Sequence, residues 1–343
     1  MPVFSDLHGN AQSQSLYLAV HLAMFKERVS VKVHILTDVE GCAGVMNAAD
    51  YVYRESRYYE QARELLTLEV SAAVEGAIEA GATEVLVADA HGPSAIDRRL
   101  LHPRALLLGG RPWPTEMSTY GIDGSYAAAM MIGQHARSNT DGGHLCHTMS
   151  FGVEEYLLNK EPIGEIGLWS LIAGYFHVPL VLVTGDQAAC DEAREYVPNV
   201  ETAAVKCGIK RGSAVGMTKE ENRFLNSAAV HMHPDESRAL IRAHAARAIQ
   251  RLPEILPARM DGPFRLEIFL RPDAGKKRPR KMVLTAGDYL DLIRPPTGQG
   301  KAKPRKKPAR KTRPAPKKKP ASKKKPAPKP RSKKPSRKGT RRK

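Results

Sequence analysis

Acidic and histidine side chains follow several short apolar segments of this 343-residue chain. Asp38 and Glu40 come directly after the segment HILT, and His91 ends the segment VLVADAH. Further along, His135 follows AAAMMIGQ and Glu165 follows PIG. Carboxylate and imidazole groups are side chains with which proteins bind zinc, and less selectively manganese or cobalt. The pattern predicts metal chemistry if the fold brings these five side chains together.

These five side chains are too many for one catalytic ion that keeps an open coordination position. They fit two ions bridged by one carboxylate, an arrangement that clamps a water molecule and polarises a carbonyl group. Taken singly, Asp38 also fits a helix cap, and His91 also fits a loop histidine. Because metal-binding residue types recur after successive strand-like segments, the metal interpretation is favoured over the two structural ones.

Apolar segments alternate with amphipathic ones, which predicts strands that alternate with helices. The expected strands are 31–37, 83–89, 126–133 (whose alanines also allow a helix), 178–186, 201–207 and 264–270. The expected helices are 55–80, 164–176, 187–196, one that opens at Pro234, and 286–293. This order predicts an α/β fold: a largely parallel sheet flanked by helices, with a smaller second α/β subdomain. Sites in such folds gather at the carboxyl ends of the strands, where the five candidate ligands are expected to converge.

Four segments carry a family resemblance: TDVEGCAG, ADAHG, IGQHARSNTDGGHLCHTMSFGV and IGEIGLWSLIAGYFHVPLVLVTGD. In order and approximate spacing they resemble the D-aminopeptidase family of binuclear zinc metallopeptidases. The likeness runs from about Val31 to about Ile293. It implies an aminopeptidase that removes the N-terminal residue of short peptides, with two Zn²⁺ per chain. A preference for a D-residue such as D-alanine, and a ring-like homo-oligomer, are implied by the resemblance alone.

The resemblance also implies a role for each candidate ligand. Asp38 would bridge the two zinc ions. Glu40 and His91 would complete one metal site, and His135 and Glu165 would complete the other.

A catalytic histidine is implied in the same way. His147 in HTMSFG matches the family's H-x-M-x-F-G histidine, which acts there as a nucleophile or as a general base. His144 in the preceding HLCH is the alternative. We favour His147, because Met149, Phe151 and Gly152 follow it as in the family's pattern.

The charge of the chain is unevenly distributed. The net charge is +18, but residues 301–343 alone carry 23 of the 54 Lys and Arg and contain no Asp or Glu. The remaining 31 basic residues face 36 acidic ones, so the rest of the chain is close to −5. The chain is therefore expected to divide into a weakly ordered extension (1–30), a metallopeptidase domain (31–297) and a disordered basic tail (298–343).

The tail interleaves its basic runs with nine prolines and five alanines, much like the tail of a linker histone. This composition predicts sequence-independent binding to DNA or RNA through phosphate contacts. A solubilising polycation and a ligand for anionic lipid or cell-wall polymer are the alternatives.

The four cysteines form no C-x-x-C pair, which indicates a reduced compartment. No apolar stretch approaches the roughly 20 residues of a membrane helix, and the apolar segment near the N-terminus lacks a basic start. We therefore expect a cytoplasmic protein with no membrane span. Two other functions stay open: a nucleic-acid-associated protein with an accessory α/β domain, and a binuclear metal hydrolase for another amide or a phosphoester.

Overall fold

The computed structural model describes residues 30–92, 94–110, 119–273 and 280–293. The basic tail lies outside the described residues, and so does the expected N-terminal extension apart from residue 30.

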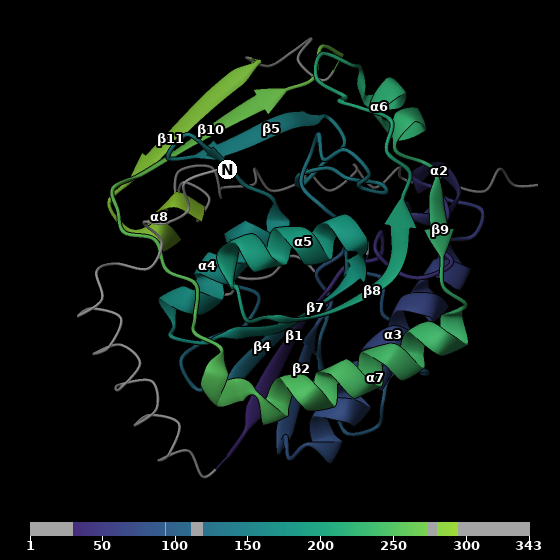
Figure 1. Cartoon of the computed structure of the whole chain (residues 1–343), viewed down its shortest axis with the longest axis vertical. Helices are drawn as coiled ribbons and strands as arrows, with labels where there is room; N and C mark the ends of the chain where they lie inside the picture. Colours follow the sequence, from purple (N-terminus) through teal and green to yellow (C-terminus); the bar gives the residue numbers. More distant parts are fainter. Residues whose placement is uncertain (1–29, 93, 111–118, 274–279, 294–343) are drawn as a thin grey trace, which may run out of the picture. The chain divides into compact units, whose positions relative to one another are not determined.

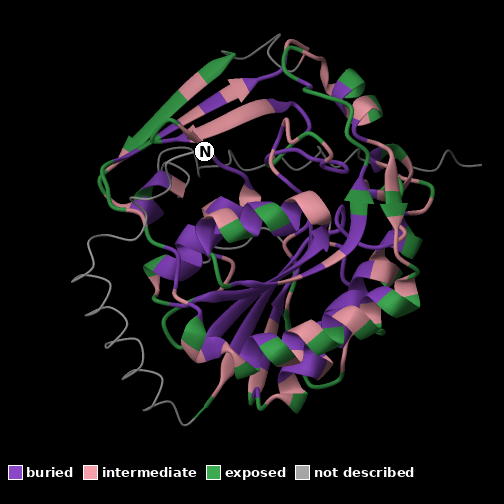
Figure 2. Cartoon of the chain, in the orientation of Figure 1, coloured by how far each residue is buried: buried purple, intermediate pink, exposed green. Residues whose placement is uncertain are grey.

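The core of the protein is a seven-stranded sheet (Figure 1). All its neighbouring strands pair in parallel except the last, β9, which runs antiparallel to β8. In spatial order the strands are β3 (Ala105–Leu108), β2 (Glu84–Ala88), β1 (Lys32–Thr37), β4 (Ala128–Gln134), β7 (Leu180–Asp186), β8 (Glu201–Gly208) and β9 (Ala229–His231). Every residue of β4 and β7 is buried, as expected for inner strands that helices cover on both faces. Figure 2 shows this buried centre.

Helices cover both faces of the sheet (Figure 1). In α3 the buried residues Ala62, Leu66, Val70, Ala73 and Ala77 recur every three or four positions, so they form one apolar face that packs on β1, β4 and α7. The helices on one face are α3 (Tyr59–Glu79) and α7 (Pro234–Gln250), and those on the other are α4 (Glu165–Tyr175) and α5 (Gln187–Tyr196). Short helices lie at α2 (Ala48–Tyr51), α6 (Lys219–Leu225), η3 (Leu252–Glu254) and α8 (Tyr289–Ile293).

A second, smaller sheet is antiparallel and has the strand order β11-β10-β5-β6. Its strands are β5 (Val153–Leu158), β6 (Glu161–Pro162), β10 (Phe264–Leu270) and β11 (Lys281–Ala286). The buried residues of β10 alternate with more accessible ones, so one face is covered and the other faces outward. Helix α8 packs against β10 and β11.

The expected α/β fold with a largely parallel sheet is confirmed, and so is the smaller second part. The expected strand 264–270 coincides with β10, and 126–133 is strand β4 rather than a helix. The expected helix 286–293 is partly wrong, because 281–286 is strand β11 and the helix begins at Tyr289. Strands β3, β5, β6 and β9 were not expected. They are short or only partly buried, so their apolar patterns are weak.

The ends of β1 and β4 approach each other so closely that two positions must be glycine. Gly133 has φ +79°, and a Cβ there would lie 2.0 Å from the carbonyl oxygen of Asp38. A Cβ on Gly41 would lie 2.0 Å from the carbonyl oxygen of Gln134. Backbone hydrogen bonds from Asp38 N to Ile132 O (2.9 Å) and from Gly41 N to Gly133 O (2.8 Å) fasten the segment after β1 to the end of β4.

We predict that Gly133→Ala destabilises the protein and displaces Asp38. The positive φ costs an L-residue about 1–2 kcal/mol, and forcing a methyl group into a packed backbone costs about 1–3 kcal/mol. The thermal unfolding midpoint should therefore fall by roughly 5 °C or more. Gly287→Ala is the matched control, because an added Cβ there meets no atom of the described residues within 4 Å. Equal midpoints for the two variants would contradict the close-approach argument.

Candidate metal centre

Five acidic and histidine side chains meet at the carboxyl edge of the central sheet. Asp38 and Glu40 follow β1, His91 follows β2, His135 follows β4, and Glu165 is the first residue of α4. The structure thus brings together the five side chains that the sequence predicted to converge. All of them except Glu165 are buried.

Two groups of ligand-type atoms lie within this cluster. Asp38, Glu40 and His91 form one group, whose ligand atoms all lie within 4.8 Å of one another. His135, Glu165 and His147 form the other, within the same limit.

Asp38 contacts both groups. Its Oδ2 lies 3.2 Å from Nε2 of His135, which belongs to the second group. Its Oδ1 accepts a hydrogen bond from the Val39 backbone at 2.9 Å, which fixes the carboxylate between the groups. The helix-cap interpretation of Asp38 is wrong, since its carboxylate faces the cluster and α2 is capped by Asn47.

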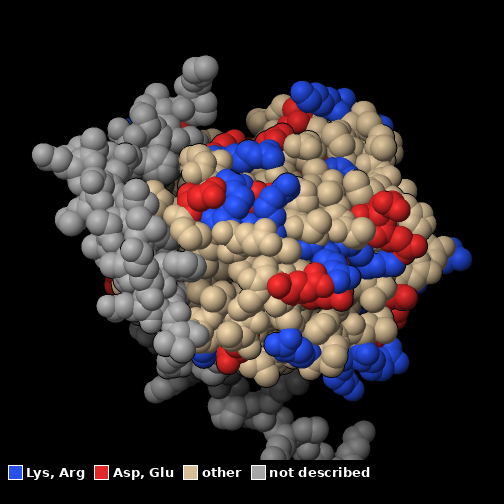
Figure 3. All heavy atoms as spheres, turned by 60° about the horizontal axis from the view of Figure 1, so that its bottom comes forward, with Lys and Arg blue, Asp and Glu red and all other residues tan. Residues whose placement is uncertain are grey.

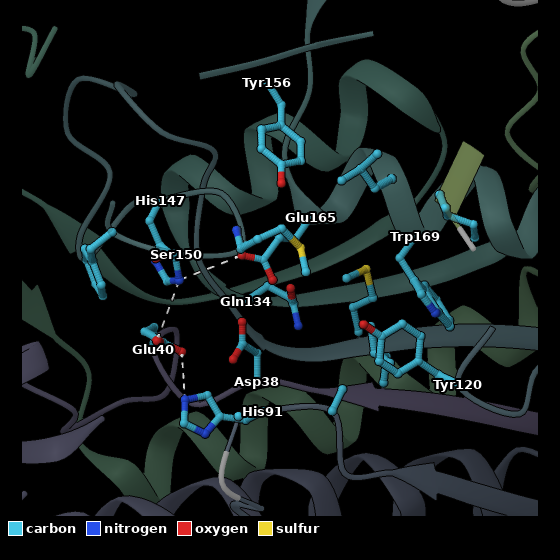
Figure 4. A pocket seen from close by; sticks show the side chains of 18 of the residues that line it. Asp38, Glu40, His91, Tyr120, Gln134, His147, Ser150, Tyr156, Glu165 and Trp169 are labelled. Atoms are coloured by element: carbon cyan, nitrogen blue, oxygen red, sulfur yellow. Dashed lines mark hydrogen bonds and ion pairs between the residues drawn. The ribbon is translucent and has the colours of Figure 1, made fainter. Parts of the chain in front are cut away.

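His147 belongs to the second group but also faces Glu40 of the first. Its Nε2 is 3.9 Å from Glu40 Oε1 and 3.8 Å from Glu165 Oε1. Its ring stacks on the ring of His135 at 3.9 Å and on the ring of Phe151 at 4.2 Å, so both of its faces are held. Figure 4 shows His147, Glu40 and Glu165 turned toward one another.

Backbone carbonyl groups set the tautomers of two histidines. Nδ1 of His135 lies 3.0 Å from the oxygen of Ala136, and Nδ1 of His147 lies 2.9 Å from the oxygen of Leu145. Each Nδ1 therefore carries the proton that it donates to the carbonyl group. Nε2 of the neutral ring then presents a lone pair to the cluster, as metal-binding histidines do.

His144 points away from the cluster. Its Nε2 lies 3.0 Å from the oxygen of Met46, and its ring meets the ring of His231 edge-on at 5.3 Å. Burial and the nearby Lys206 charge lower the pKa of His144 to about 2, so it stays neutral. Of the two candidate histidines, His147 is the one that faces the carboxylates.

The carboxylates in the cluster disturb one another. Burial and the charge of Glu40 raise the pKa of Asp38 to about 7. Burial opposes ionisation of Glu40 as well, but His91 outweighs it and holds the pKa of Glu40 well below its ordinary value. Burial lowers the pKa of His135, yet contact with Asp38 and Glu165 raises it well above its ordinary value. Without a bound cation, the protein can balance these charges only by moving protons between the carboxylates and the histidines.

A pair of divalent metal ions fits this cluster. Oε2 of Glu40 and Nε2 of His135 are buried and lack a hydrogen-bond partner among the described residues. Buried polar atoms without partners are costly, and a cation would satisfy both of them. The ligand set, with oxygen and nitrogen atoms only, suits zinc and related ions.

A buried lysine holds the segment that carries Asp38 and Glu40. Nζ of Lys206, on β8, donates to the backbone oxygen of Glu40 and, at 3.3 Å, to that of Val45. Burial lowers the pKa of Lys206 to about 8. Sequence reasoning missed this residue. A single charged side chain in the apolar strand segment TAAVKCG was the only available signal.

A cavity of about 640 Å³ opens onto the cluster. Aromatic side chains line it, and Figure 4 shows the hydroxyl group of Tyr156 directed toward Glu165, with Tyr120 and Trp169 farther along the wall. The residues that sequence reasoning missed are wall residues from the second sheet, from the nearby helices and from the loops that hold Tyr53 and Tyr120. They are Tyr53, Tyr120, Tyr156, Leu168, Trp169, Ile172, Lys219, Arg223, Leu266, Ile268, Leu284, Leu292 and Ile293.

Comparisons with known proteins find a matching family and similar proteins. The model of the D-aminopeptidase family of peptidases matches residues 31–276. A D-aminopeptidase of Bacillus subtilis (strain 168) is 39% identical over 184 residues, which are 53% of this chain and 66% of that protein. The match thus spans just under two thirds of the length of that relative.

A solved structure is also similar. It is that of the Zn-dependent D-aminopeptidase DppA from Bacillus subtilis, described as a self-compartmentalizing protease. Its TM-score is 0.65 and its sequence identity is 30%, over 77% of this chain and 94% of that one.

We predict that zinc raises the thermal unfolding midpoint of the metal-free protein by about 5 °C or more, because a ligand that binds only the folded state stabilises it. Asp38→Ala should abolish the whole rise, since Asp38 contacts both groups. Differential scanning calorimetry at increasing zinc concentrations measures the rise, and elemental analysis of the dialysed protein counts the bound ions. Glu84→Gln, at the far end of β2, should keep the wild-type rise. If the Asp38 variant kept half of the rise and one ion, Asp38 would not bridge.

Proposed function

The chain belongs to the D-aminopeptidase family, and on that premise we propose that it is a zinc-dependent aminopeptidase. Its substrates are short peptides, and it releases their N-terminal residue, a D-amino acid such as D-alanine. The relatives support the D-preference, because both are D-aminopeptidases.

One observation carries this proposal. Two adjacent groups of metal-binding side chains, joined by Asp38, lie at one end of a cavity of about 640 Å³. That volume suits a small ligand such as a short peptide rather than a folded protein.

We propose two zinc ions per chain with the following ligands. Asp38 bridges them, Glu40 and His91 complete one site, and His135 and Glu165 complete the other. The two groups of ligand atoms support this division, and the zinc-dependence of the DppA structure supports the choice of metal.

His147 is the residue that we propose acts on the peptide. Because its Nδ1 donates to the Leu145 carbonyl group, its Nε2 is the atom free to react. Nε2 either takes a proton from the attacking water or attacks the carbonyl carbon itself. The stacked rings of His135 and Phe151 hold it in place for both roles. Bound zinc would supply Lewis acidity toward the carbonyl group.

Two other functions compete with this proposal. A binuclear centre also suits hydrolysis of another amide or of a phosphoester. A nucleic-acid-associated protein would use the α/β part only as an accessory. The complete ligand set disfavours the second alternative, because an accessory domain has no need of buried carboxylates that require a cation. Assays with p-nitrophenyl phosphate and with peptide anilides separate the two hydrolytic functions.

We propose that the chain forms a homo-oligomer with a ring-like arrangement. The self-compartmentalizing DppA structure supports this, as do the exposed apolar side chains of Val215, Phe224 and Val230. Light scattering that found a monomer at micromolar concentration would contradict it.

We propose a cytoplasmic location. The free thiols of Cys42, Cys146, Cys190 and Cys207 support a reducing compartment. Among the described residues, no helix has the length and hydropathy that crossing a bilayer requires. Recovery of the protein outside the cell in a fractionation experiment would contradict this location.

We also propose that residues 298–343 form a separate basic tail that binds DNA or RNA without sequence preference. Its 23 basic residues support this, with no acidic residue beside them. One face of the rest of the chain offers phosphate little unpaired positive charge. On the face formed by α3 and α7 its arginines alternate with acidic side chains (Figure 3). Arg242 pairs with Glu75 and Glu79, and Arg251 pairs with Glu201 and Glu254.

For the catalytic residue, we predict that His147→Ala lowers kcat for D-alanine p-nitroanilide by about 10²–10⁴-fold, the usual effect of losing a general base. Metal content should stay at the wild-type level, since the five proposed ligands remain. A chelator should abolish wild-type turnover, and added zinc should restore it. His177→Asn, in a turn whose left-handed backbone tolerates Asn, is the matched control. Unchanged turnover in His147→Ala would refute the assignment, and turnover of L-alanine p-nitroanilide alone would refute the D-preference.

For the tail, we predict that deleting 301–343 leaves turnover of a small peptide nearly unchanged and sharply weakens binding to duplex DNA. Binding by the full chain should fall steeply as salt rises, because the tail displaces many counterions from the phosphates. Gel shifts at two salt concentrations, run beside the peptidase assay, test both statements. If the truncated chain binds DNA as tightly as the full chain does, the tail proposal fails. If truncation abolishes peptide cleavage, the domain division fails.

A further inference from the structure

Two basic side chains of α6, Lys219 and Arg223, line the cavity that opens onto the metal cluster. We infer that Arg223, assisted by Lys219, binds the C-terminal carboxylate of the substrate, so that the enzyme selects very short peptides with a free C-terminus. The inference rests on the proposed aminopeptidase function and adds a substrate class to it.

The guanidinium group of Arg223 is held in place by two aromatic rings. Its carbon lies 4.9 Å from the centre of the Tyr53 ring and 5.1 Å from the centre of the Phe151 ring. The ring of Phe151 also stacks on the ring of His147. The arginine is therefore attached, through one ring, to the residue proposed to act on the peptide bond.

Arg223 has a buried donor to spare. A guanidinium group carries five N–H donors in a planar fork. One donor on Nη1 is used by Glu220 at 2.9 Å, and one on Nη2 is used by the hydroxyl group of Tyr53. Nε is buried and has no hydrogen-bond partner among the described residues. A carboxylate accepts two parallel N–H bonds from such a fork, so it is the ligand that best satisfies this edge.

The charges around α6 agree with an anionic ligand but do not demand one. Glu220 pairs with both Lys219 and Arg223 and is 70% exposed, so solvent weakens its hold on them. Asp273 accepts a hydrogen bond from the Lys219 backbone and offsets part of the remaining charge. We therefore infer the carboxylate subsite from two observations and not from net charge. Nε of Arg223 is buried and has no hydrogen-bond partner among the described residues, and Arg223 lines the cavity.

The distance to Arg223 limits the length of the peptide. From the centre of the His147 ring, a contact of 4.2 Å leads to Phe151, and a contact of 5.1 Å leads from there to the guanidinium carbon. The direct distance from the centre of the His147 ring to the guanidinium carbon of Arg223 therefore cannot exceed the sum of these two distances. Consecutive Cα atoms lie about 3.8 Å apart, so about two residues beyond the reacting carbonyl group span it. Because the two contacts give an upper bound, a tripeptide reaches the arginine at the largest separation and a dipeptide at a shorter one, whereas longer peptides carry their carboxylate past it.

The test compares D-alanyl-glycyl-glycine with its C-terminal amide, which lacks the C-terminal charge, and repeats the comparison with D-alanyl-glycine and its amide. We expect the wild type to favour the free acid in kcat/KM by about tenfold to a hundredfold, the usual effect of one charge-assisted hydrogen bond. The preference should lie mainly in KM, because the carboxylate is remote from the reacting bond. In Arg223→Gln the acid-to-amide ratio should collapse to about one, and in Arg223→Lys part of the preference should return.

Arg194→Gln is the matched control. It removes an arginine that also pairs with an acidic residue three positions earlier, but on α5 and outside the residues that line the cavity. Its acid-to-amide ratio should equal that of the wild type. Thermal unfolding of each variant shows whether it is folded, and Arg223→Lys keeps the test decisive if Arg223→Gln is not.

The possible results distinguish failure of the carboxylate subsite from failure of the proposed function. A wild type that cleaves D-alanine p-nitroanilide but treats acid and amide alike overturns the carboxylate subsite and leaves the proposed function intact. An Arg223→Gln protein that keeps the wild-type ratio also overturns it. A wild type that cleaves none of these substrates overturns the proposed function, and the subsite with it.

Discussion

Three carboxylates share one largely buried cluster, and this constraint governs the rest of the site. Asp38, Glu40 and Glu165 repel one another in surroundings that screen charge poorly. Although burial lowers the pKa of His91 and His135, the neighbouring carboxylates raise it above its ordinary value, so these two rings hold protons that offset part of the repulsion. Burial and the charge of His135 lower the pKa of His147, so its ring stays neutral. A pair of divalent cations would take over the role of the two protons. It would let the carboxylates ionise and free the rings of His91 and His135 to bind metal.

The cluster exists because backbone, more than side chains, brings the strand ends together. Gly41 and Gly133 allow the segment after β1 to lie directly against the end of β4. Lys206 then fixes the same segment from β8, through the carbonyl groups of Glu40 and Val45. Residues that never touch a metal ion or a peptide thus determine where the ligands lie. A survey restricted to ligand types would overlook them.

Much of the fold, and the meeting of the five ligand-type side chains, could be predicted from sequence, for a physical reason. A buried parallel strand is a continuous apolar run, and a charged residue at its end stands out, as Asp38 and His91 do. Strand β5 has the sequence VEEYLL, in which Glu154 and Glu155 interrupt any alternation, and β11 is largely exposed, so neither gives a clear pattern. The residues that line the cavity likewise form no recognisable pattern in the sequence. Arg223 matters because Phe151 stacks between it and His147, and only the tertiary structure joins these three residues.

The antiparallel sheet and α8 contribute cavity wall, whereas the five ligand-type residues come from the ends of the parallel strands and the start of α4. These two sets of residues can therefore diverge at different rates. Substitutions in β10, β11 or α8 would reshape the cavity without changing the five ligand-type residues. β10, β11 and α8 are encoded downstream of all five ligand-type residues, so this part of the wall can change without altering the stretch of the gene that holds them.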